Sequence, residues 1–253
     1  MNAHDSRRAF RALHSSGFFI IPNAWDAGSA VRLAALGFKA LASTSSGAAW
    51  AVGRKDGELG RNAVLAHLRL LVAATDLPIN ADFEDGFADA PEEVAANVEL
   101  ALETGVAGLS IEDWSGARFY DTAHAVERLH AAREAMDRVD PQAMLVGRHE
   151  HFRDPAEPAA DAIARAVAYA QAGADCLFVP MLNDPGAVAE LIAAVSPKPV
   201  NVLVHEFDDR IPALARAGVR RVSVGGSLAR AAWDGFDRAA ETLRAFEPSS
   251  SRS

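Results

Sequence analysis

Residues 78–114 read PINADFEDGFADAPEEVAANVELALETGVAGLSIEDW, and the pattern in this stretch decides the fold. Two short apolar segments, 78–84 (PINADFE) and 108–114 (GLSIEDW), have the length and composition of strands that are buried on both faces. Between them, residues 92–104 carry apolar positions at helical spacing, and Gly105 supplies a stop signal before the second segment. The stretch therefore predicts a strand–helix–strand unit of the kind found in parallel sheets.

The same alternation of short apolar segments and longer helical patterns continues along the chain. The other predicted strands are 18–23, 40–45, 143–150, 176–182, 199–204 and 221–225. The other predicted helices are 27–36, 61–74, 122–138, 158–172, 186–195, 208–217 and 229–245. Eight successive strand–helix units predict a parallel α/β sheet that closes into a (β/α)8 TIM barrel. An open doubly wound sheet is the alternative, but no G-x-G-x-x-G motif follows the first predicted strand.

Length and composition narrow the class of protein. At 253 residues the chain has the usual size of one barrel, so we expect a single barrel domain over 1–245 and a disordered polar tail over 246–253. A net charge of −9 argues against nucleic acid or an anionic membrane as a partner, but it does not argue against a small anionic substrate. The single cysteine, Cys176, excludes an internal disulfide, and neither a secretory signal nor a membrane-length apolar segment is found. We therefore expect a cytoplasmic protein.

Charged side chains gather where the predicted strands end, which is where the chemistry of a barrel takes place. Asp82 and Glu84 end the third predicted strand, Glu112 the fourth and Arg148 the fifth. Because side chains alternate along a strand, Asp82 and Glu84 are expected on one side, close to Glu112 of the neighbouring strand. Carboxylates packed together repel one another, and a hard divalent cation such as Mg2+ relieves that repulsion. The alternative is that these acids form structural ion pairs with Arg148.

Four residues are candidates for binding and catalysis. Arg148 can bind a substrate carboxylate bidentately, or it can offset the negative charge that develops on an enolate. After the second predicted strand, backbone N–H groups around Ser46 and Gly47 could cradle a carboxylate, although such a composition is also typical of an ordinary turn. Asp56, in the loop GRKDGELG, could reach the mouth of the barrel, although a loop aspartate is more often solvated.

Five motifs together resemble the phosphoenolpyruvate mutase/isocitrate lyase superfamily. They are PNAWDAGSA near the start, S-S-G after the second predicted strand, ADFEDGF, G-x-x-IED and GRHE. The resemblance covers essentially the whole chain and implies a barrel that binds Mg2+ or Mn2+ and assembles into a homodimer or homotetramer, often exchanging the last helix. It also implies a small 2-oxo or 2-hydroxy carboxylate substrate that is cleaved or rearranged through an enolate-like intermediate.

The resemblance also assigns roles to individual positions. It implies that Asp82, Glu84 and Glu112 hold the metal, directly or through water, with Glu84 in a place where the family has Asp. The family's carboxylate-binding turn falls on Ser46 and Gly47. Its remaining catalytic positions are the arginine, the loop aspartate and the metal-binding glutamate, which correspond to Arg148, Asp56 and Glu112.

One departure from the family concerns the loop after the fourth predicted strand. The lyase members carry Lys-Lys-Cys-Gly-His there, with the cysteine as the proton-transferring group, whereas this chain reads WSGARFYDTAHA. Cys176 lies inside a predicted strand and is expected to be a packed core thiol. Arg118, Tyr120 and His124 are possible substitutes, although each fits an ordinary loop or helix residue. His149 and His151 flank Glu150, and we expect a structural role for them, with a place at the mouth of the barrel as the alternative for His151.

Three functions remain as hypotheses. The first is a Mg2+-dependent lyase that cleaves a carbon–carbon bond of a small 2-oxo or 2-hydroxy carboxylate through an enolate, as isocitrate lyase or oxaloacetate decarboxylase does. Decarboxylation needs no separate proton-transferring loop for the cleavage step, so it is compatible with the missing cysteine. The second is a phosphoenolpyruvate phosphonomutase or phosphonopyruvate hydrolase, which would use the same metal and arginine. The third is a barrel that binds a metabolite without turning it over.

Overall fold

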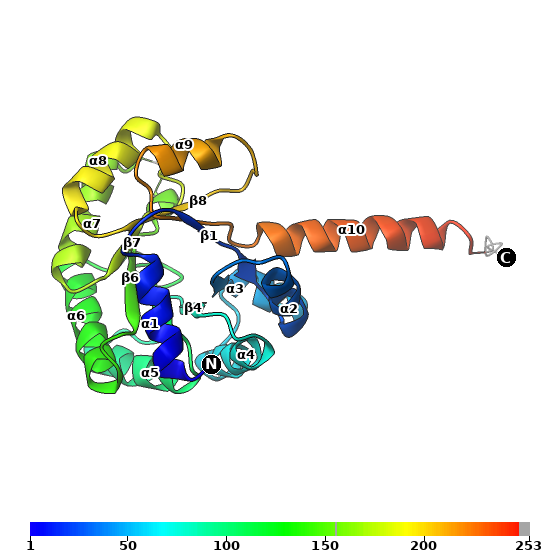
Figure 1. Ribbon diagram of the computed structural model, residues 1–253, viewed down its shortest axis with the longest axis horizontal. Helices are drawn as coiled ribbons and strands as arrows, with labels where there is room; N and C mark the ends of the chain where they lie inside the picture. The colour runs from blue at the N-terminus through cyan, green and yellow to red at the C-terminus, as the bar shows by residue number, and fades with distance from the viewer. Residues whose placement is uncertain (155, 248–253) are drawn as a thin grey trace.

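The computed structural model describes residues 1–154 and 156–247, and its strands form one parallel sheet that curls into a barrel (Figure 1). Around the sheet the order is β1-β9-β8-β7-β6-β5-β4-β3-β2. The strands are β1 (Phe19–Ile21), β2 (Asn23–Ala24), β3 (Leu41–Ser43), β4 (Ile79–Asp82), β5 (Gly108–Glu112), β6 (Met144–Arg148), β7 (Cys176–Phe178), β8 (Val200–Leu203) and β9 (Arg221–Ser223). The predicted barrel is confirmed.

The ring of strands closes at a proline. Strand β1 pairs with β9 and strand β2 pairs with β3, both in parallel, and only Pro22 separates β1 from β2 along the chain. Proline has no backbone N–H and so cannot donate to a ladder. Its carbonyl still accepts a hydrogen bond from the Ala42 N–H at 3.0 Å. The single strand predicted over 18–23 is therefore divided into β1 and β2. For this reason the described sheet has nine strands where the sequence predicts eight.

Helices lie between successive strands at nearly the predicted positions. They are α2 (Ala27–Ala35), α4 (Arg61–Ala74), α5 (Pro91–Glu103), α6 (Thr122–Val139), α7 (Ala159–Gln171), α8 (Pro185–Val195), α9 (Arg210–Arg216) and α10 (Ser227–Arg244). Three elements were not predicted, namely α1 (Ala3–Leu13), α3 (Ser45–Ala51) and the short 3-10 helix η1 (His151–Arg153). In the described part of the chain, no helix is both long and apolar enough to cross a membrane.

Helix α1 lies across the barrel and closes its floor, the end at which the strands begin (Figure 1). Phe10 is fully buried and packs in one cluster with Ala107 and Met144, which precede or begin strands β5 and β6. Arg7 is also buried, donates hydrogen bonds to two backbone carbonyls before β5 and forms an ion pair with Asp140 at 3.2 Å. The helix is held largely by arginines rather than by an apolar stripe, so its sequence pattern resembles that of a solvated segment.

Strand β4 ends earlier than predicted, and this changes the direction of Glu84. The strand stops at Asp82, and Glu84 has a φ of 47°, in the left-handed region that non-glycine residues seldom adopt. The prediction that Asp82 and Glu84 lie on one side assumed that both belong to the strand. That assumption is wrong, because Glu84 lies beyond the end of β4. The turn is closed by a hydrogen bond from the Gly86 N–H to the Phe83 carbonyl, and Glu112 N–H donates to the Glu84 carbonyl at 2.9 Å.

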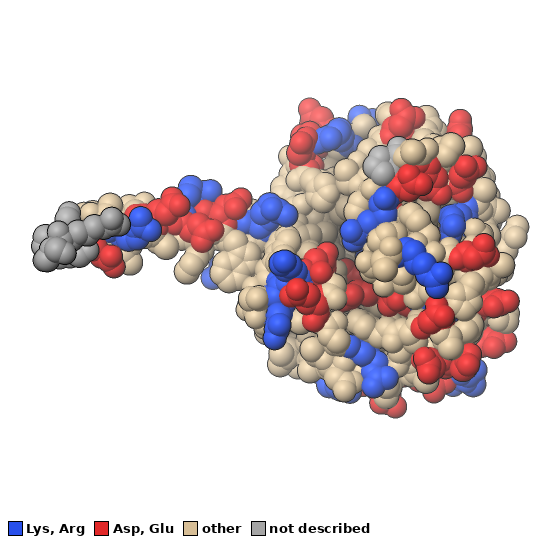
Figure 2. Space-filling view, turned by 180° about the vertical axis from the view of Figure 1, so that it is seen from behind, with Lys and Arg blue, Asp and Glu red and all other residues tan. Residues whose placement is uncertain are grey.

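Helix α10 extends away from the barrel as an arm (Figure 1), with acidic and basic side chains along it (Figure 2). Ala229, near its start, is the buried residue of this helix. Phe236 and Leu243 are 62% and 72% exposed, and Trp233 is partly exposed as well. Of the tail that was predicted over 246–253, residues 248–253 lie outside the described residues.

Candidate active site

A cavity of about 740 Å³ opens at the ends of the strands opposite α1. Polar side chains from several strands and from the start of α3 line it, which is where the sequence places the chemistry of the barrel. All seven candidate residues lie in the described part of the chain. Those on the cavity wall are Ser46, Asp56, Asp82 and Arg148; Gly47, Glu84 and Glu112 lie outside the wall.

Arg148 is the centre of a cluster of carboxylates. Its Nη1 lies 3.1 Å from Asp82 Oδ1 and 3.3 Å from Glu112 Oε2, and its Nε donates to Glu150 Oε1. The three acids come from the ends of adjacent strands β4, β5 and β6, where Glu112 is in register with Arg148. Burial disfavours the charged guanidinium, but these carboxylates together raise the pKa of Arg148. Arg148 therefore stays a cation on the cavity wall.

Burial also disfavours the charged form of the acids in this cluster, which for a carboxyl group means a higher pKa. It raises the pKa of Glu112 and of Glu150, although the guanidinium of Arg148 opposes that rise. Asp82 is fixed from a second side, because its Oδ2 accepts a hydrogen bond from Ser45 N–H at the start of α3, at 3.0 Å. The ion pairs that the sequence left open as an alternative are thus formed by Asp82 and Glu112.

Within residues 1–154 and 156–247, Glu84 is the member of the predicted metal set that has no cationic partner. Its Oε1 is buried and accepts no hydrogen bond within the described residues. Burial, followed by the charges of Asp82, Asp56 and Asp85, raises the pKa of Glu84 to about 8. A buried carboxylate without a partner, next to a cluster in which acids outnumber the one guanidinium, is the environment that a divalent cation stabilises.

The arrangement of these acids bears on how a cation would be held. Asp82, Glu84 and Glu112 are not gathered within the 4.8 Å that encloses a compact ligand set in the part of the chain that the structure describes. Contact through water, which Mg2+ commonly keeps when it binds to proteins, fits this wider spacing. The residues present therefore fit a hydrated Mg2+ ion better than one coordinated directly by all three carboxylates.

The serine-rich turn after β3 is the first turn of helix α3. Thr44 caps this helix, accepting a hydrogen bond from Gly47 N–H at 3.4 Å through Oγ1, which also lies 3.0 Å from Ser46 Oγ. Gly47 is buried, and a Cβ atom there would lie 2.8 Å from side-chain carbons of Thr44 and Trp25. Thr44, Ser45 and Ser46 of this turn line the cavity, whereas the Gly47 N–H is used within the helix cap.

Asp56 follows α3 in a long loop and lies on the cavity wall. The residue as a whole is exposed, yet partial desolvation of its carboxyl group raises the pKa of Asp56. The charge of Asp82 acts in the same direction, while Ser45 and Arg148 oppose it. Asp56 is therefore a carboxyl group that holds its proton to a higher pH than an ordinary aspartate.

The loop after β5 holds three residues that could replace the family's cysteine, namely Arg118, Tyr120 and His124. None of them is among the described residues that line the cavity. Arg118 is exposed in a turn that is closed by the bridge between Trp114 and Phe119. Tyr120 is buried and donates to Asp85 Oδ2 at 2.8 Å, and His124 bonds the Asp89 carbonyl through Nε2 at 3.0 Å. Tyr120 and His124 have structural contacts, and Cys176 is fully buried in the barrel interior, as predicted for a core thiol.

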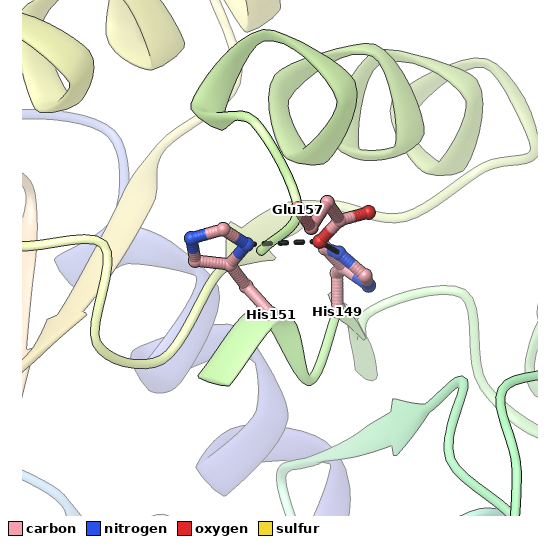
Figure 3. Close-up of side chains that lie close together, drawn as sticks. All are labelled: His149, His151 and Glu157. Carbon is pink, nitrogen blue, oxygen red and sulfur yellow. Dashed lines mark hydrogen bonds and ion pairs between the residues drawn. The ribbon is translucent and has the colours of Figure 1, made fainter. Parts of the chain in front are cut away.

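A second cluster, formed by His149, His151 and Glu157, was not predicted (Figure 3). Glu157 Oε2 lies 2.6 Å from His149 Nε2 and 2.8 Å from His151 Nδ1, while His149 Nδ1 lies 2.6 Å from Asp113 Oδ2. Burial opposes the charged imidazole, but Asp113 and Glu157 raise the pKa of His149. Only the H-E-H run hinted at this cluster in the sequence, because Glu157 approaches through the chain after η1.

The same three side chains could hold a metal ion, since their ligand atoms lie within 4.8 Å of one another. Asp113 would then fix the tautomer and orientation of His149, as carboxylates behind metal-binding histidines commonly do. Imidazole nitrogens favour ions such as Zn2+ over Mg2+. The histidines and the carboxylates around Arg148 are therefore suited to different metals.

The raised pKa of Glu84 predicts a change in stability with pH. A carboxyl group with a folded-state pKa above its unfolded value favours folding fully below about pH 4.5, and this contribution is lost as the pH rises through about 8. In protein stripped of metal, we therefore expect Glu84→Gln to melt at the wild-type temperature near pH 4.5 and roughly 10 °C higher at pH 8. Scanning calorimetry at both pH values measures this. The exposed Glu103→Gln variant is the control, and an equal effect of both substitutions would contradict the prediction.

The chain is similar to known proteins along most of its length. The family model for phosphoenolpyruvate phosphomutase matches residues 10–244. The uncharacterized protein Rv1998c of Mycobacterium tuberculosis is 34% identical over 220 residues, covering 86% of this chain and 81% of its own. The 2-methylisocitrate lyase of Salmonella typhimurium is 30% identical over 224 residues, covering 82% and 72%.

The chain is also similar to a solved structure. It is a crystal structure from Burkholderia cenocepacia J2315 of a protein whose activity is given only as lyase or mutase. This chain matches it with a TM-score of 0.91 and 45% identity, over 96% of this chain and 88% of that one. The chain therefore belongs to the phosphoenolpyruvate phosphomutase family, within the phosphoenolpyruvate mutase/isocitrate lyase superfamily.

Proposed function

We propose that this chain is a Mg2+-dependent lyase that cleaves a carbon–carbon bond of a small 2-oxo or 2-hydroxy carboxylate through an enolate. The observation that supports it most directly is Arg148, a half-buried cation on the cavity wall that pairs with Asp82, Glu112 and Glu150. Similarity to a 2-methylisocitrate lyase adds support for the class of reaction.

In this proposal Asp82, Glu84 and Glu112 hold the Mg2+ ion, a role that Mn2+ could also fill. The bound metal supplies Lewis-acid polarisation of a substrate oxygen. The donors of Arg148 hold the substrate carboxylate and face the negative charge that develops as the bond breaks. The Ser46 hydroxyl, which lines the same cavity, adds a donor for that carboxylate, and Gly47 shapes the turn that presents it.

The family's loop cysteine has no counterpart here, and Asp56 is the group best placed to replace it. It lies on the cavity wall, and its raised pKa lets its carboxyl group carry a proton at a higher pH than an ordinary aspartate. A carboxyl group of this kind can donate a proton to the carbon that becomes negative after bond cleavage. In this role Asp56 acts in place of Arg118, Tyr120 and His124, which are not on the described cavity wall.

A second candidate is a phosphonomutase or phosphonopyruvate hydrolase, favoured by the family model itself. It would use Arg148 and the same metal. The third candidate is a barrel that binds a metabolite without chemistry.

One assay separates these functions. The purified chain is incubated with Mg2+ and, separately, with isocitrate, 2-methylisocitrate, oxaloacetate and phosphonopyruvate, and products are followed by NMR. We expect turnover of at least one carboxylate, which EDTA abolishes and Mg2+ restores. Turnover of phosphonopyruvate alone would replace the proposal by the second candidate. Oxalate binding without turnover of any of these acids would favour the third.

We also propose that the chain forms a homodimer or homotetramer in which α10 packs on a neighbouring copy. The support is its exposed apolar residues, Trp233, Phe236 and Leu243, because an unpartnered apolar helix face in water is unfavourable. Light scattering on the eluted protein should show an oligomer, and the double variant Phe236→Asp/Leu243→Asp should elute as a monomer. An unchanged mass for the double variant would contradict this.

A further inference from the structure

The floor of the cavity contains a buried arginine that the proposed chemistry does not use. Arg221 lies on β9, is 3% exposed and lines the same cavity as Arg148. Its Nε donates to Asn201 Oδ1 at 2.9 Å, and its Nη1 lies 3.2 Å from His14 Nε2 of the segment after α1. No partner is found for its Nη2 among residues 1–154 and 156–247.

Arg221 has no acidic partner in the part of the chain that the structure describes. Cys176 is the one titratable neighbour that would favour its charge, and burial raises the pKa of that thiol, which keeps it neutral. His14 is neutral too, because burial and the charge of Arg221 lower its pKa to about 3. A neutral imidazole accepts the hydrogen bond from Nη1, while its Nδ1 lies 2.8 Å from the Phe10 carbonyl. The charge of Arg221 is therefore left without compensation.

The wall around Arg221 is unusually polar for a barrel interior, which bulky aliphatic side chains normally fill. Asn201 donates to Ser223 Oγ at 2.9 Å, and both residues line the cavity. Asn80 lines it as well, and its Oδ1 is buried with no hydrogen-bond partner. Buried polar groups without partners are costly, so they indicate a polar ligand or water at this position.

We propose that Arg221 binds a second carboxylate of the substrate, at the end of the molecule opposite the group held by Arg148. The substrate is then a dicarboxylate that reaches from the strand ends to the floor of the barrel. Within the described residues Nη2 of Arg221 has no partner, so it can donate charge-assisted hydrogen bonds to a carboxylate. This inference rests on the proposed function, since it assumes that the 2-oxo or 2-hydroxy acid end of the substrate lies at Arg148.

Binding of matched ligands by calorimetry, with Mg2+ present, tests the inference. The pairs are 2-oxoglutarate with 2-oxopentanoate and 2-oxoadipate with 2-oxohexanoate, which differ only in whether a carboxylate or a methyl group ends the chain. Oxalate, whose carboxylates are directly bonded, reports on the Arg148 end alone. In the wild type we expect the diacid to bind about 10- to 100-fold more tightly than its partner in at least one pair.

The variants Arg221→Met and Arg221→Lys complete the test. We expect the Met variant to lose the diacid preference, the Lys variant to keep part of it, and both to bind oxalate as the wild type does. Without ligand, the Met variant should melt no lower than the wild type, because the uncompensated charge is gone. A purely structural role, in which Arg221 clamps His14 to Asn201, predicts a lower melting temperature.

The outcomes separate the two proposals. If the wild type shows no diacid preference in either pair, or the Met variant retains that preference, the role of Arg221 is wrong. If oxalate fails to bind the wild type in the presence of Mg2+, the proposed function fails instead.

Discussion

Replacing Arg148 by methionine is expected to lower kcat by about 10³-fold for whichever carboxylate the chain turns over. Arg148 is the cation that contacts Asp82, Glu112 and Glu150, and it is the donor group on the cavity wall next to these acids. Methionine fills similar space without charge, so donors that face the developing negative charge are lost. Steady-state kinetics on the active substrate measure the effect.

The same substitution also leaves buried carboxylates without their partner, which can destabilise the fold by about 3–5 kcal/mol. Circular dichroism must therefore show that the variant is folded at the assay temperature. Arg148→Lys keeps the charge but loses the planar fork, and we expect it to recover only part of the activity. Arg153→Met is the matched control, because Arg153 is also near Glu150, at 3.9 Å, but is 41% exposed. Retention of more than about a tenth of kcat by Arg148→Met would contradict the role given to Arg148.

The second large effect is expected for Asp82→Asn, which should weaken Mg2+ binding by about 10- to 100-fold or more and lower turnover at least as much. Asp82 is the predicted metal ligand that lies on the cavity wall, and its carboxylate is fixed by Ser45 N–H and by Arg148. Asparagine keeps the shape and one acceptor but removes the negative charge. Titration with Mn2+, followed by electron paramagnetic resonance, measures the affinity directly.

The control for this prediction is Asp89→Asn, which removes the same charge from an exposed position between β4 and α5. It should leave Mn2+ affinity unchanged. Equal affinities for the wild type and for Asp82→Asn would place the metal elsewhere, and the cluster of His149, His151 and Glu157 would be the next position to test.

The barrel was predictable because the buried positions of its strands and of most of its helices carry apolar residues in regular patterns. The helix predicted over 61–74 occurs with those bounds, and the strand at 108–114 differs only at its end. Helix α1 was missed because its buried contacts include Arg7, which the sequence alone cannot distinguish from a solvated arginine. Helix α3 was missed because a serine-rich start, capped by Thr44, resembles a turn.

The candidate site was predictable only as a set of strand ends. Strand order brings Asp82, Glu112 and Arg148 together, and strand order follows from the alternating units. The direction of Glu84 depends on a left-handed backbone angle, for which a non-glycine residue gives no sequence signal. Arg221 was missed because a charged residue within the strand predicted over 221–225 looks like an exposed one until its burial is known.

The arginine-rich helix at the floor has a consequence for the order in which a growing chain can fold. Arg7 pairs with a residue 133 positions later, and Arg11 with Asp175, 164 positions later. His14 contacts Arg221, which lies 207 positions after it. Helix α1 is synthesised before every one of these partners, so Phe10 on its buried side has no barrel to pack against until they have been made. Helix α1 can therefore dock on the floor of the barrel only after the later strands have formed.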